Sequence, residues 1–336
     1  MTERTIQLGH GGGGRLSRDL IREQVLSRFG EGPLRSLPDA ALLPWKAKGL
    51  VFSTDSFVVN PLRFPGGSIG HLAVHGTVND LAVSGARPLW LSLALILEEG
   101  LPFAVLAGVL DDVQAAARDC QVGIATGDTK VVGRGQCDGM YICTSGVGEP
   151  LSGFALSPRR IQVGDRLLVS GPLGDHGVAI MAAREGIRIG HPPQSDTASV
   201  HRLVLAAALG HAEQVRLMRD PTRGGLAAVL NEWVEDREIG LRVQEKALPF
   251  SPGARALAET LGLDLLQVPS EGRMLLMCAP EAAEAICKLW REMPEGRDAA
   301  IIGEATAEAG RVVIQTAVGG RRLLDIPQGE LLPRIC

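Results

Sequence analysis

Hydrophobic and polar positions along the chain fall into two blocks in which strand-like and helix-like segments alternate. In the first block, short apolar runs bounded by Gly, Pro and polar residues predict strands at 49–59, 88–97, 123–132 and 140–150. Apolar residues spaced three to four positions apart predict helices at 68–85 and 101–120.

The second block repeats this mixture. Apolar runs predict strands at 165–171, 240–245, 272–279 and 299–305. Helical spacing predicts helices at 178–185, 199–210, 251–262 and 280–293, and a loop that leads into a helix within 219–236. Several strands are joined by short turns rather than by helices. The pattern therefore predicts two α+β domains with mixed sheets and not one doubly wound sheet.

The two ends of the chain differ from these blocks. Residues 5–8 predict a short strand, followed by a Gly-rich segment and an amphipathic helix over 15–30. The last dozen residues hold two prolines and no periodicity, which is typical of an extended tail. We expect four parts: a flap and helix (1–40), an N-terminal domain (41–155), a C-terminal domain (160–325) and a mobile tail (326–336).

The length, net charge and apolar runs of the chain exclude several classes of function. The chain has 336 residues, which favours two domains, and its net charge of −4 gives no reason to expect nucleic acid. The N-terminus lacks the apolar core of a signal peptide. The longest apolar run, Leu89 to Leu97, is far shorter than the ~20 residues of a membrane span. We expect a cytoplasmic protein that binds neither nucleic acid nor membrane.

The six cysteines predict no zinc ribbon and no dithiol redox centre, because none forms a CxxC pair. Cys143, Cys278 and Cys287 lie in apolar runs typical of buried positions. Cys336 is different. It is the last residue, where packing is expected to be poorest and exposure greatest.

Three aspartates in the first block predict a cation site. Asp55, Asp80 and Asp128 each lie in an otherwise apolar, Gly/Thr/Ser-rich setting, where a carboxylate is costly unless it is paired or bound to a cation. Mg²⁺ is usually held by one or two carboxylates together with substrate phosphates. Asn79 adds a neutral donor and acceptor beside Asp80. The alternative is three unrelated caps or turn residues.

Phosphate contacts are predicted at two places in this block. The Gly-rich segment 9–14, which includes Gly11 and Gly12, opens into a helix and can present backbone N–H groups to phosphate. It lacks the acidic partner of a dinucleotide fingerprint, and a flexible linker is the alternative. Lys130 follows a Gly-Asp-Thr turn and can contact a phosphate as a point charge, unless it is an ordinary surface lysine.

In the second block, two loops and one glutamate are candidates. Residues 171–177, which include His176, and 220–225, which include Asp220 and Arg223, each open a helix. A helix N-terminus can bind an anion, but such loops are also normal turns, and the sequence leaves both open. Glu271 precedes a buried strand and can act as a base. His71 and His75 are spaced i, i+4 without a third ligand, which favours helix packing or exposure to solvent over a metal site.

Seven segments carry a family resemblance: FSTDSFVVNPLRFPGG, GTVNDLAVSGARP, LILEEGLP, TGDTKVV, VSGPLGDHG, DPTRGG and the terminal PRIC. They resemble the hydrogenase-maturation carbamoyl dehydratases of the HypE family, in the superfamily of aminoimidazole ribonucleotide synthetase, selenophosphate synthetase and thiamine-phosphate kinase. The likeness runs from the Gly-rich segment to the last residue, and PRIC is its most specific part. One departure is GHGGGG, where relatives often have HGSGG or HGAGG. The extra glycine only loosens the flap.

The resemblance implies an α+β, two-domain aminoimidazole-ribonucleotide-synthetase-like fold, with the N-terminal domains of a homodimer pairing into a β-barrel and ATP and Mg²⁺ bound near that interface. It also implies a reaction. Cys336 would receive a carbamoyl group from the carbamoyltransferase HypF, and ATP would drive its dehydration to a thiocyanate. The cyanide would pass to the HypC–HypD complex and become an iron ligand of [NiFe]-hydrogenase.

Residue roles follow from the same resemblance. Asp55, Asp80 and Asp128 would hold Mg²⁺, Lys130 would face the γ-phosphate, and Glu271, with His176 in reserve, would accept protons. Asp80 would act in catalysis as well. Nucleotide contacts would come from Gly11, Gly12, Asp55, Asn79, Asp80, Gly127, Asp128, Thr129, Lys130, Asp220 and Arg223. Residues 326–336 could span ~35 Å if extended, long enough to swing the Cys336 thiol between two sites.

Three alternative functions would each predict something different of the chain. A selenophosphate synthetase would need a reactive Cys or selenocysteine in the Gly-rich segment, and that segment has none. An aminoimidazole ribonucleotide synthetase would have no use for Cys336. An ATP-binding scaffold of the maturation complex, without turnover, is the alternative from a different class.

Overall fold

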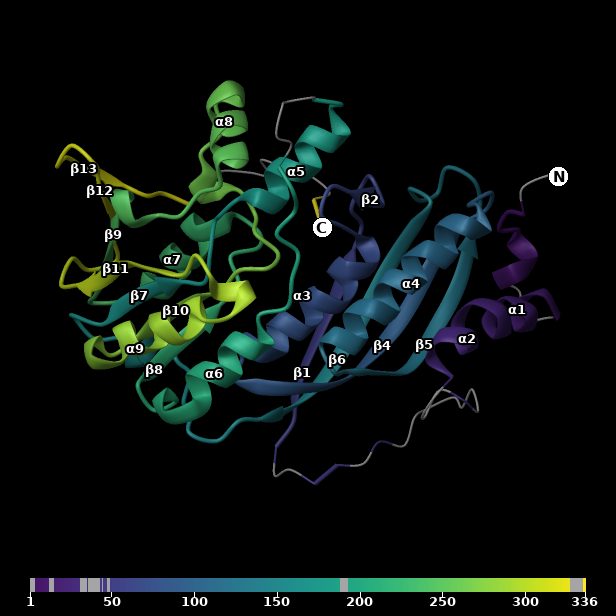
Figure 1. Cartoon of the computed structure of the whole chain (residues 1–336), viewed down its shortest axis with the longest axis horizontal. Coiled ribbons are helices and arrows are strands. Elements are labelled where there is room, and N and C mark those ends of the chain that lie inside the picture. Colours follow the sequence, from purple (N-terminus) through teal and green to yellow (C-terminus); the bar gives the residue numbers. More distant parts are fainter. Residues whose placement is uncertain are drawn as a thin grey trace. The chain divides into compact units, whose positions relative to one another are not determined.

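The computed structural model describes residues 4–11, 15–30, 35, 43, 45–46, 49–187, 193–326 and 335–336. The chain divides into two compact units (Figure 1). The N-terminal unit holds Met1–Leu81, Pro88–Pro150 and Arg334–Cys336, and the C-terminal unit holds Ala82–Arg87 and Leu151–Pro333. The end of the tail therefore belongs to the N-terminal unit.

The N-terminal unit is built on a four-stranded mixed sheet. Its order is β1 (Val51–Phe57), β6 (Met140–Pro150), β4 (Ala86–Glu98) and β5 (Gly123–Val132). β1 and β6 are antiparallel, whereas β4 and β5 are parallel. The other elements of this unit are η1 (Leu8–Gly11), α1 (Arg15–Leu20), η2 (Ile21–Leu26), α2 (Ser27–Phe29), β2 (Arg63–Phe64), β3 (Gly67–Ser68), α3 (Ile69–Val83) and α4 (Phe103–Asp119).

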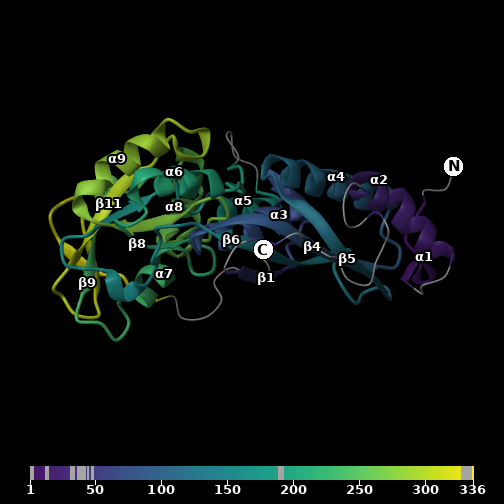
Figure 2. The same ribbon diagram turned by 90° about the horizontal axis from the view of Figure 1, so that it is seen from below.

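Only one face of this sheet is covered by the described helices, because α3 and α4 lie on the same side (Figure 2). Strand residues alternate accordingly. Phe57 is buried on the helix side of β1, while Phe52 on the other side is 62% exposed. Its cross-strand partner on β6, Val147, is half-buried. The uncovered face thus carries apolar side chains.

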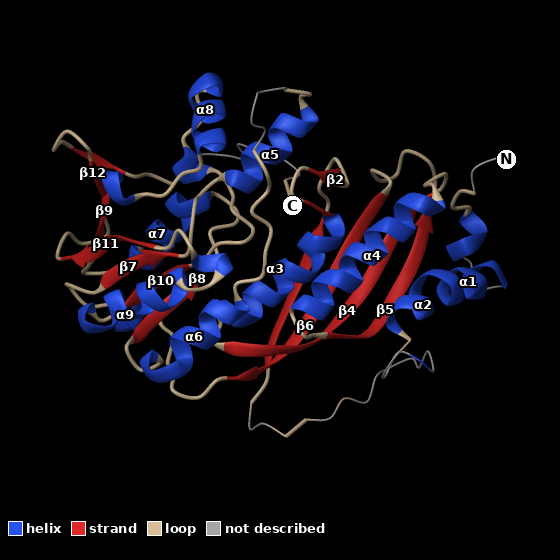
Figure 3. Cartoon of the chain, viewed as in Figure 1, coloured by secondary structure: helices blue, strands red, loops and turns tan. Residues whose placement is uncertain are grey.

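The C-terminal unit has a seven-stranded sheet whose order is β13 (Arg321–Leu323), β12 (Val312–Gln315), β9 (Gly240–Gln244), β11 (Ala300–Thr306), β7 (Arg166–Val169), β10 (Leu275–Cys278) and β8 (Val215–Arg219). Neighbours are antiparallel except β9 and β12. Its helices (Figure 3) are α5 (Asp175–Arg184), α6 (His201–His211), α7 (Gly225–Val234), α8 (Pro252–Leu261) and α9 (Pro280–Arg291), with short 3₁₀ turns η4 (Pro158–Arg160), η5 (Glu245–Ala247), η6 (Leu265–Gln267) and η7 (Pro294–Gly296).

Helices cover both faces of the second sheet. α7 packs through Leu226, Leu230 and Trp233 against one face, and α6 and α9 pack against the other. A smaller cluster joins α5 to α8. This double cover explains the near-continuous apolar sequence of the central strands, such as β10, whose four residues are all buried.

The strand register brings three loops together at one end of strands β7, β10 and β8. β10 runs antiparallel to both of its neighbours, so Leu275 at its start pairs with Val169 at the end of β7 and with Arg219 at the end of β8. The segments that follow β7 and β8 and the segment that precedes β10 therefore meet. They are 170–174, 220–224 and 270–274.

Several local expectations were wrong. Residues 5–8 form a single bridge at Thr5 and the start of the 3₁₀ turn η1 rather than a strand. The helix expected at 15–30 contains a π-helical stretch, η2. β8, β12 and β13 were not expected. They are three to five residues long, and β13 is exposed throughout. Such strands are stabilised by their pairing partners and leave little local periodicity.

Candidate functional site

Two of the candidate aspartates lie at the contact between β1 and α3. The Ser53 hydroxyl donates to Asp80 Oδ2 at 2.6 Å. Asp55 is two residues further along β1 on the same face, and a Cβ built at Gly76 would lie 2.8 Å from the Phe57 ring and 3.5 Å from Asp55 Oδ2. Glycine at 76 thus lets strand and helix approach closely. Asp55 and Asp80 are half-buried, and Asn79 beside them is fully buried.

Asp128 lies at a different place in the unit. It is exposed on β5, where its carboxylate accepts the Thr129 N–H at 2.8 Å and pairs with Lys130 Nζ at 3.2 Å. β6 and β4 separate β1 from β5, so three strand spacings, roughly 14 Å, lie between Asp55 and Asp128. Among the described residues, no three His, Cys, Asp or Glu side chains form a metal-binding group. The three-aspartate magnesium site stays a prediction.

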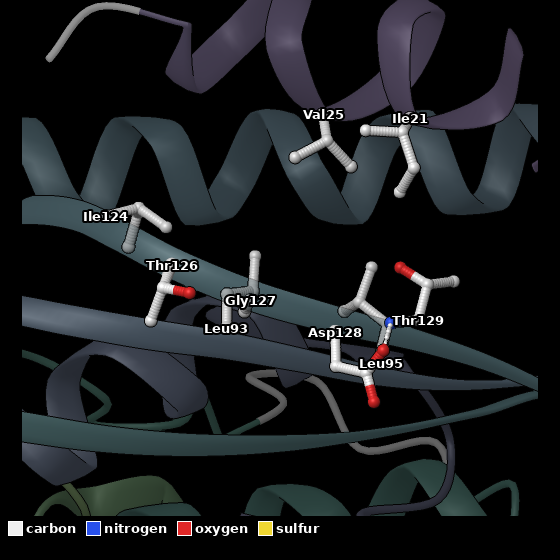
Figure 4. Close-up of a pocket in the computed structure, with 9 residues that line it drawn as sticks. All are labelled: Ile21, Val25, Leu93, Leu95, Ile124, Thr126, Gly127, Asp128 and Thr129. Carbon is white, nitrogen blue, oxygen red and sulfur yellow. Dashed lines mark hydrogen bonds between the residues drawn. The ribbon is translucent and has the colours of Figure 1, made fainter. Parts of the chain in front are cut away.

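Gly127 has a packing role of its own. A Cβ at this position would lie 2.3 Å from the Leu93 carbonyl oxygen, so the parallel pairing of β4 and β5 leaves no room for a side chain. Residues 126–129 border a small pocket whose other walls are apolar (Figure 4), formed by Ile21, Val25, Leu93, Leu95 and Ile124. Lys130 itself is largely exposed. This part of β5 is therefore exposed to solvent.

The Gly-rich segment is anchored where it begins. The ring of His10 is buried, with its Nδ1 accepting the Gln7 N–H at 2.9 Å. The Ser17 hydroxyl donates to the His10 carbonyl at 2.7 Å. Gly11 is the last residue of η1, and Gly12 lies outside the described residues. The predicted phosphate contacts of these two glycines stay predictions.

The end of the tail is docked, so the expectation of a fully exposed terminal residue is wrong. Cys336 is half-buried and Ile335 is 5% exposed. A terminal oxygen of Cys336 accepts the Val58 N–H at 3.0 Å, just beyond the end of β1. The physical reasons are simple. Burial of the Ile335 side chain is favourable, and the backbone N–H of Val58 needs an acceptor.

In the C-terminal unit, two predicted residues are brought together. His176 is fully buried in the first turn of α5, where its Nδ1 lies 2.8 Å from Ser195 Oγ. Glu271 is also buried, and its N–H donates to Asp196 Oδ1 at 2.9 Å. Consecutive residues, Ser195 and Asp196, therefore hold the two candidate proton acceptors.

The other two predicted residues of this unit differ in exposure. Asp220 is buried directly after β8, whereas Arg223 is exposed. The turn between them and α7 requires glycine, because Gly224 and Gly225 have φ values of 72° and 60°. The Ser270 N–H donates to the Pro221 carbonyl at 3.0 Å, which ties this turn to the segment that carries Glu271.

Asp175 and Asp196 were not among the residues predicted from the sequence. Asp175 is buried beside His176 and accepts a short hydrogen bond from the Ser251 hydroxyl. Burial raises the pKa of Asp175 to about 6, the Ser251 bond opposes this shift, and the neighbouring Asp196 carboxylate adds to it. The position of Asp175 at a helix start was a usable signal. Asp196 lies in an aperiodic polar stretch, QSDTAS, which carries none.

Family models match most of both units. Residues 38–149 match the N-terminal domain of AIR synthase related proteins, and residues 162–315 match the C-terminal domain. Carbamoyl dehydratase HypE of Bradyrhizobium diazoefficiens is 48% identical over 332 residues, which cover 98% of this chain and 96% of that protein. The chain belongs to the HypE family. The predicted family, the enzyme class that its name states and the two-domain α+β fold are thereby confirmed.

Solved HypE structures agree with this fold. A hydrogenase maturation protein HypE in complex with ATP has a TM-score of 0.94 and 44% identity, and the match covers 99% of this chain and all of that chain. HypE from a HypE–HypF complex has a TM-score of 0.80 and 39% identity, covering 92% and 99%. Within the described residues, none of the helices has the length and apolar character that crossing a membrane requires.

Proposed function

We propose that this chain uses ATP to dehydrate a carbamoyl group carried on Cys336 to a thiocyanate, which supplies the cyanide ligand for assembly of the [NiFe]-hydrogenase iron centre. The observation that carries the proposal is the position of Cys336. In this chain of the HypE family, Cys336 is hydrogen-bonded to Val58, just beyond the end of β1, the strand that carries Asp55.

The reaction balances with ATP as the only co-reactant. The carbamoyl oxygen of the thiocarbamate attacks the γ-phosphorus, and ADP leaves. Phosphorylation makes this oxygen a good leaving group. Breaking its bond to carbon releases inorganic phosphate, and loss of both N–H protons leaves S–C≡N on Cys336. The chain must therefore bind ATP, orient the thiocarbamate and accept protons. HypE solved in complex with ATP supports the first requirement.

The carboxylates suit a magnesium ion that accompanies ATP. Asp55 on β1 and Asp80 on α3 are half-buried carboxylates at the contact between these two elements. Mg²⁺ prefers carboxylate oxygens as ligands, together with phosphate oxygens. When bound, the ion would neutralise phosphate charge. Asp128 and Lys130 at the open part of β5 would contact phosphate from a second place.

Proton acceptance is assigned to the C-terminal unit. Glu271 is the first candidate and His176 the reserve, because both are buried and held by adjacent residues. A carboxylate or imidazole held in a fixed position can accept a proton from a bound substrate. Asp220 and Arg223 flank this site from the turn before α7, and we assign them to nucleotide contacts.

Three partner assignments belong to the same proposal. The HypE–HypF complex supports HypF as the carbamoyl donor, and we assign the HypC–HypD complex as cyanide acceptor, in the cytoplasm. A homodimer through the uncovered sheet face would bury the apolar side chains there. It would also allow Asp128 of one subunit to serve a nucleotide bound by the other, which suits its separation from Asp55.

Mass spectrometry of the intact protein tests the proposal. The chain is incubated with HypF, carbamoyl phosphate and ATP, and Mg-ATP is added afterwards. We expect a gain of ~43 Da on Cys336 and then a loss of ~18 Da, in the order of a covalent-carrier reaction. Cys336→Ala should show neither step. Cys137→Ala, a half-buried cysteine elsewhere in the unit, is the matched control and should show both. Absence of the adduct in the parent would favour the scaffold function.

A further inference from the structure

The buried carboxylate of Asp196 contacts the backbone of Glu271. The Asp196 side chain has no exposed surface. Its Oδ1 accepts the Glu271 N–H, but its Oδ2 has no hydrogen-bond partner among the described residues. In the described part of the chain, Asp196 forms an ion pair with the Arg273 guanidinium, whose Nε lies 3.7 Å from Oδ2. This distance is an ion pair and not a hydrogen bond.

Arg273 connects the same segment to the loop that precedes His176. Its Nε donates to the Pro172 carbonyl at 2.9 Å, and its Nη1 donates to the Gly272 carbonyl at 3.2 Å. The guanidinium also lies against Gly171, where a Cβ would meet its Nε at 3.0 Å and its Cζ at 3.1 Å. Arg273 therefore holds the start of β10 to the β7–α5 loop.

Gly272 packs directly against the backbone of residues 196–198, where a side chain would not fit. A Cβ there would lie 1.8 Å from the Asp196 carbonyl oxygen and 2.6 Å from the Ala198 nitrogen, so the two backbones touch. On the other side, Ser195 Oγ contacts His176 Nδ1 and accepts the Thr197 N–H at 3.1 Å. The short segment 195–198 thus fixes His176 and Glu271 at once.

Fold stability alone does not account for this group. The same unit holds a second buried pair, Asp165 and Arg216, with nearly equal exposure: 2% and 16%, against 0% and 16% for Asp196 and Arg273. Both oxygens of Asp165 are hydrogen-bonded to Arg216, and Oδ2 also accepts the Gln162 N–H. Asp196 lacks such compensation for a carboxylate removed from water, which makes it a costly way to stabilise a loop.

We propose that Asp196 and Arg273 are positioning residues for the proton-accepting site. Asp196 fixes the backbone of Glu271 against the segment that holds His176, and Arg273 fixes the start of β10 against the β7–α5 loop. Neither residue touches substrate in this role. The inference rests on the proposed function, in which Glu271 accepts a proton.

The test is a single-turnover assay on the full chain. Protein carbamoylated by HypF receives saturating Mg-ATP, and the rate of the second mass change is measured, together with the ATP concentration that gives half the maximal rate. Asp196→Ala should lower the maximal rate by about 100-fold, the cost of a ~1 Å misplacement, with the half-saturating ATP concentration unchanged. Asp196→Asn still accepts the Glu271 N–H and should restore the rate to within about tenfold of the parent.

Two further variants keep the outcome decisive. Asp165→Ala is the matched control, since it breaks a buried pair of the same exposure outside the site. It should lose at least as much stability and keep the parent's rate. Arg273→Lys keeps the charge but loses the fork of donors, and serves if Asp196→Ala does not fold. We expect it to slow the reaction by about tenfold with an unchanged half-saturating ATP concentration.

The outcomes separate the inference from the function on which it rests. Parent-like rates in Asp196→Ala, or in Arg273→Lys, would overturn the inference. So would an equal slowing in Asp165→Ala, because the effect would then be loss of stability. Glu271→Gln tests the underlying role. If it keeps the full rate, Glu271 is not the acceptor and the inference falls with it. If the parent shows no second mass change, the proposed function itself fails.

Discussion

Asp80 offers a way to remove charge from the candidate site without removing a contact. Asparagine can still accept the Ser53 hydrogen bond, so Asp80→Asn should fold normally. We expect it to accept the carbamoyl group but to lose about 100-fold or more in ATP-driven dehydration, the scale of one missing electrostatic group. Asp111→Asn, on an exposed carboxylate of α4, is the control. Normal turnover by Asp80→Asn would remove this carboxylate from the site.

Asp175 should make stability depend on pH in the opposite sense to a paired surface carboxylate. Its pKa is raised from 3.8 to about 6 by burial, so the folded state prefers the protonated form. Between these values the folded state binds more protons than the unfolded state, and stability falls as the pH rises through this window. Above pH 6 the penalty is fully present.

Replacing Asp175 with Asn removes this ionisation and keeps an acceptor for the Ser251 hydroxyl. We expect Asp175→Asn to be more stable than the parent at pH 8, by on the order of 2 kcal/mol, and to gain little at pH 4. Urea unfolding of both proteins at the two pH values measures the difference. A gain of equal size at both pH values would show that ionisation is not the cause.

At the level of elements, Gly127 decides how closely two parallel strands can pair. A Cβ there would lie 2.3 Å from the Leu93 carbonyl oxygen, so Gly127→Ala must push β5 away from β4. We expect a loss of about 2 kcal/mol or more in unfolding free energy, as for other steric insertions. Gly133→Ala, where the nearest atom is the end of the Gln136 side chain at 3.3 Å, should cost much less. Thermal unfolding compares the two.

Elements with a long periodic pattern were predictable, and those that depend on distant partners were not. β5 has the bounds that its sequence pattern predicts, 123–132, and α3 and α4 differ from theirs only at the ends. β13 could not be found, because its three exposed residues become a strand only by pairing with β12.

The same limit applies to the candidate site. Glu271 and His176 were found from local settings, but their shared support by residues 195 and 196 joins segments up to 75 positions apart in the sequence. Nothing local marks such a contact. Asp55, Asp80 and Asp128 show the converse. Similar sequence settings suggested one cluster, whereas the strand order places the third aspartate across the sheet.

For the whole molecule, the uncovered sheet face predicts how subunits associate. Phe52 lies on this face and is 62% exposed. In a barrel-type homodimer the position would become buried, so a charged side chain there would weaken the association. We expect Phe52→Lys to weaken the dimer by about tenfold or more in Kd, measured by sedimentation equilibrium. Leu261→Lys, at an exposed apolar residue of the C-terminal unit, is the control and should leave the dimer intact. A monomeric parent would contradict the homodimer.

The hydrogen bond between Val58 and the last residue has a practical consequence for protein production. The acceptor is the main-chain oxygen of Cys336. An affinity tag fused after Cys336 would attach residues to a half-buried position. Purification handles and fluorescent labels therefore belong at the other end of the chain. The activity of a protein with a tag after Cys336 would therefore differ from that of the untagged protein.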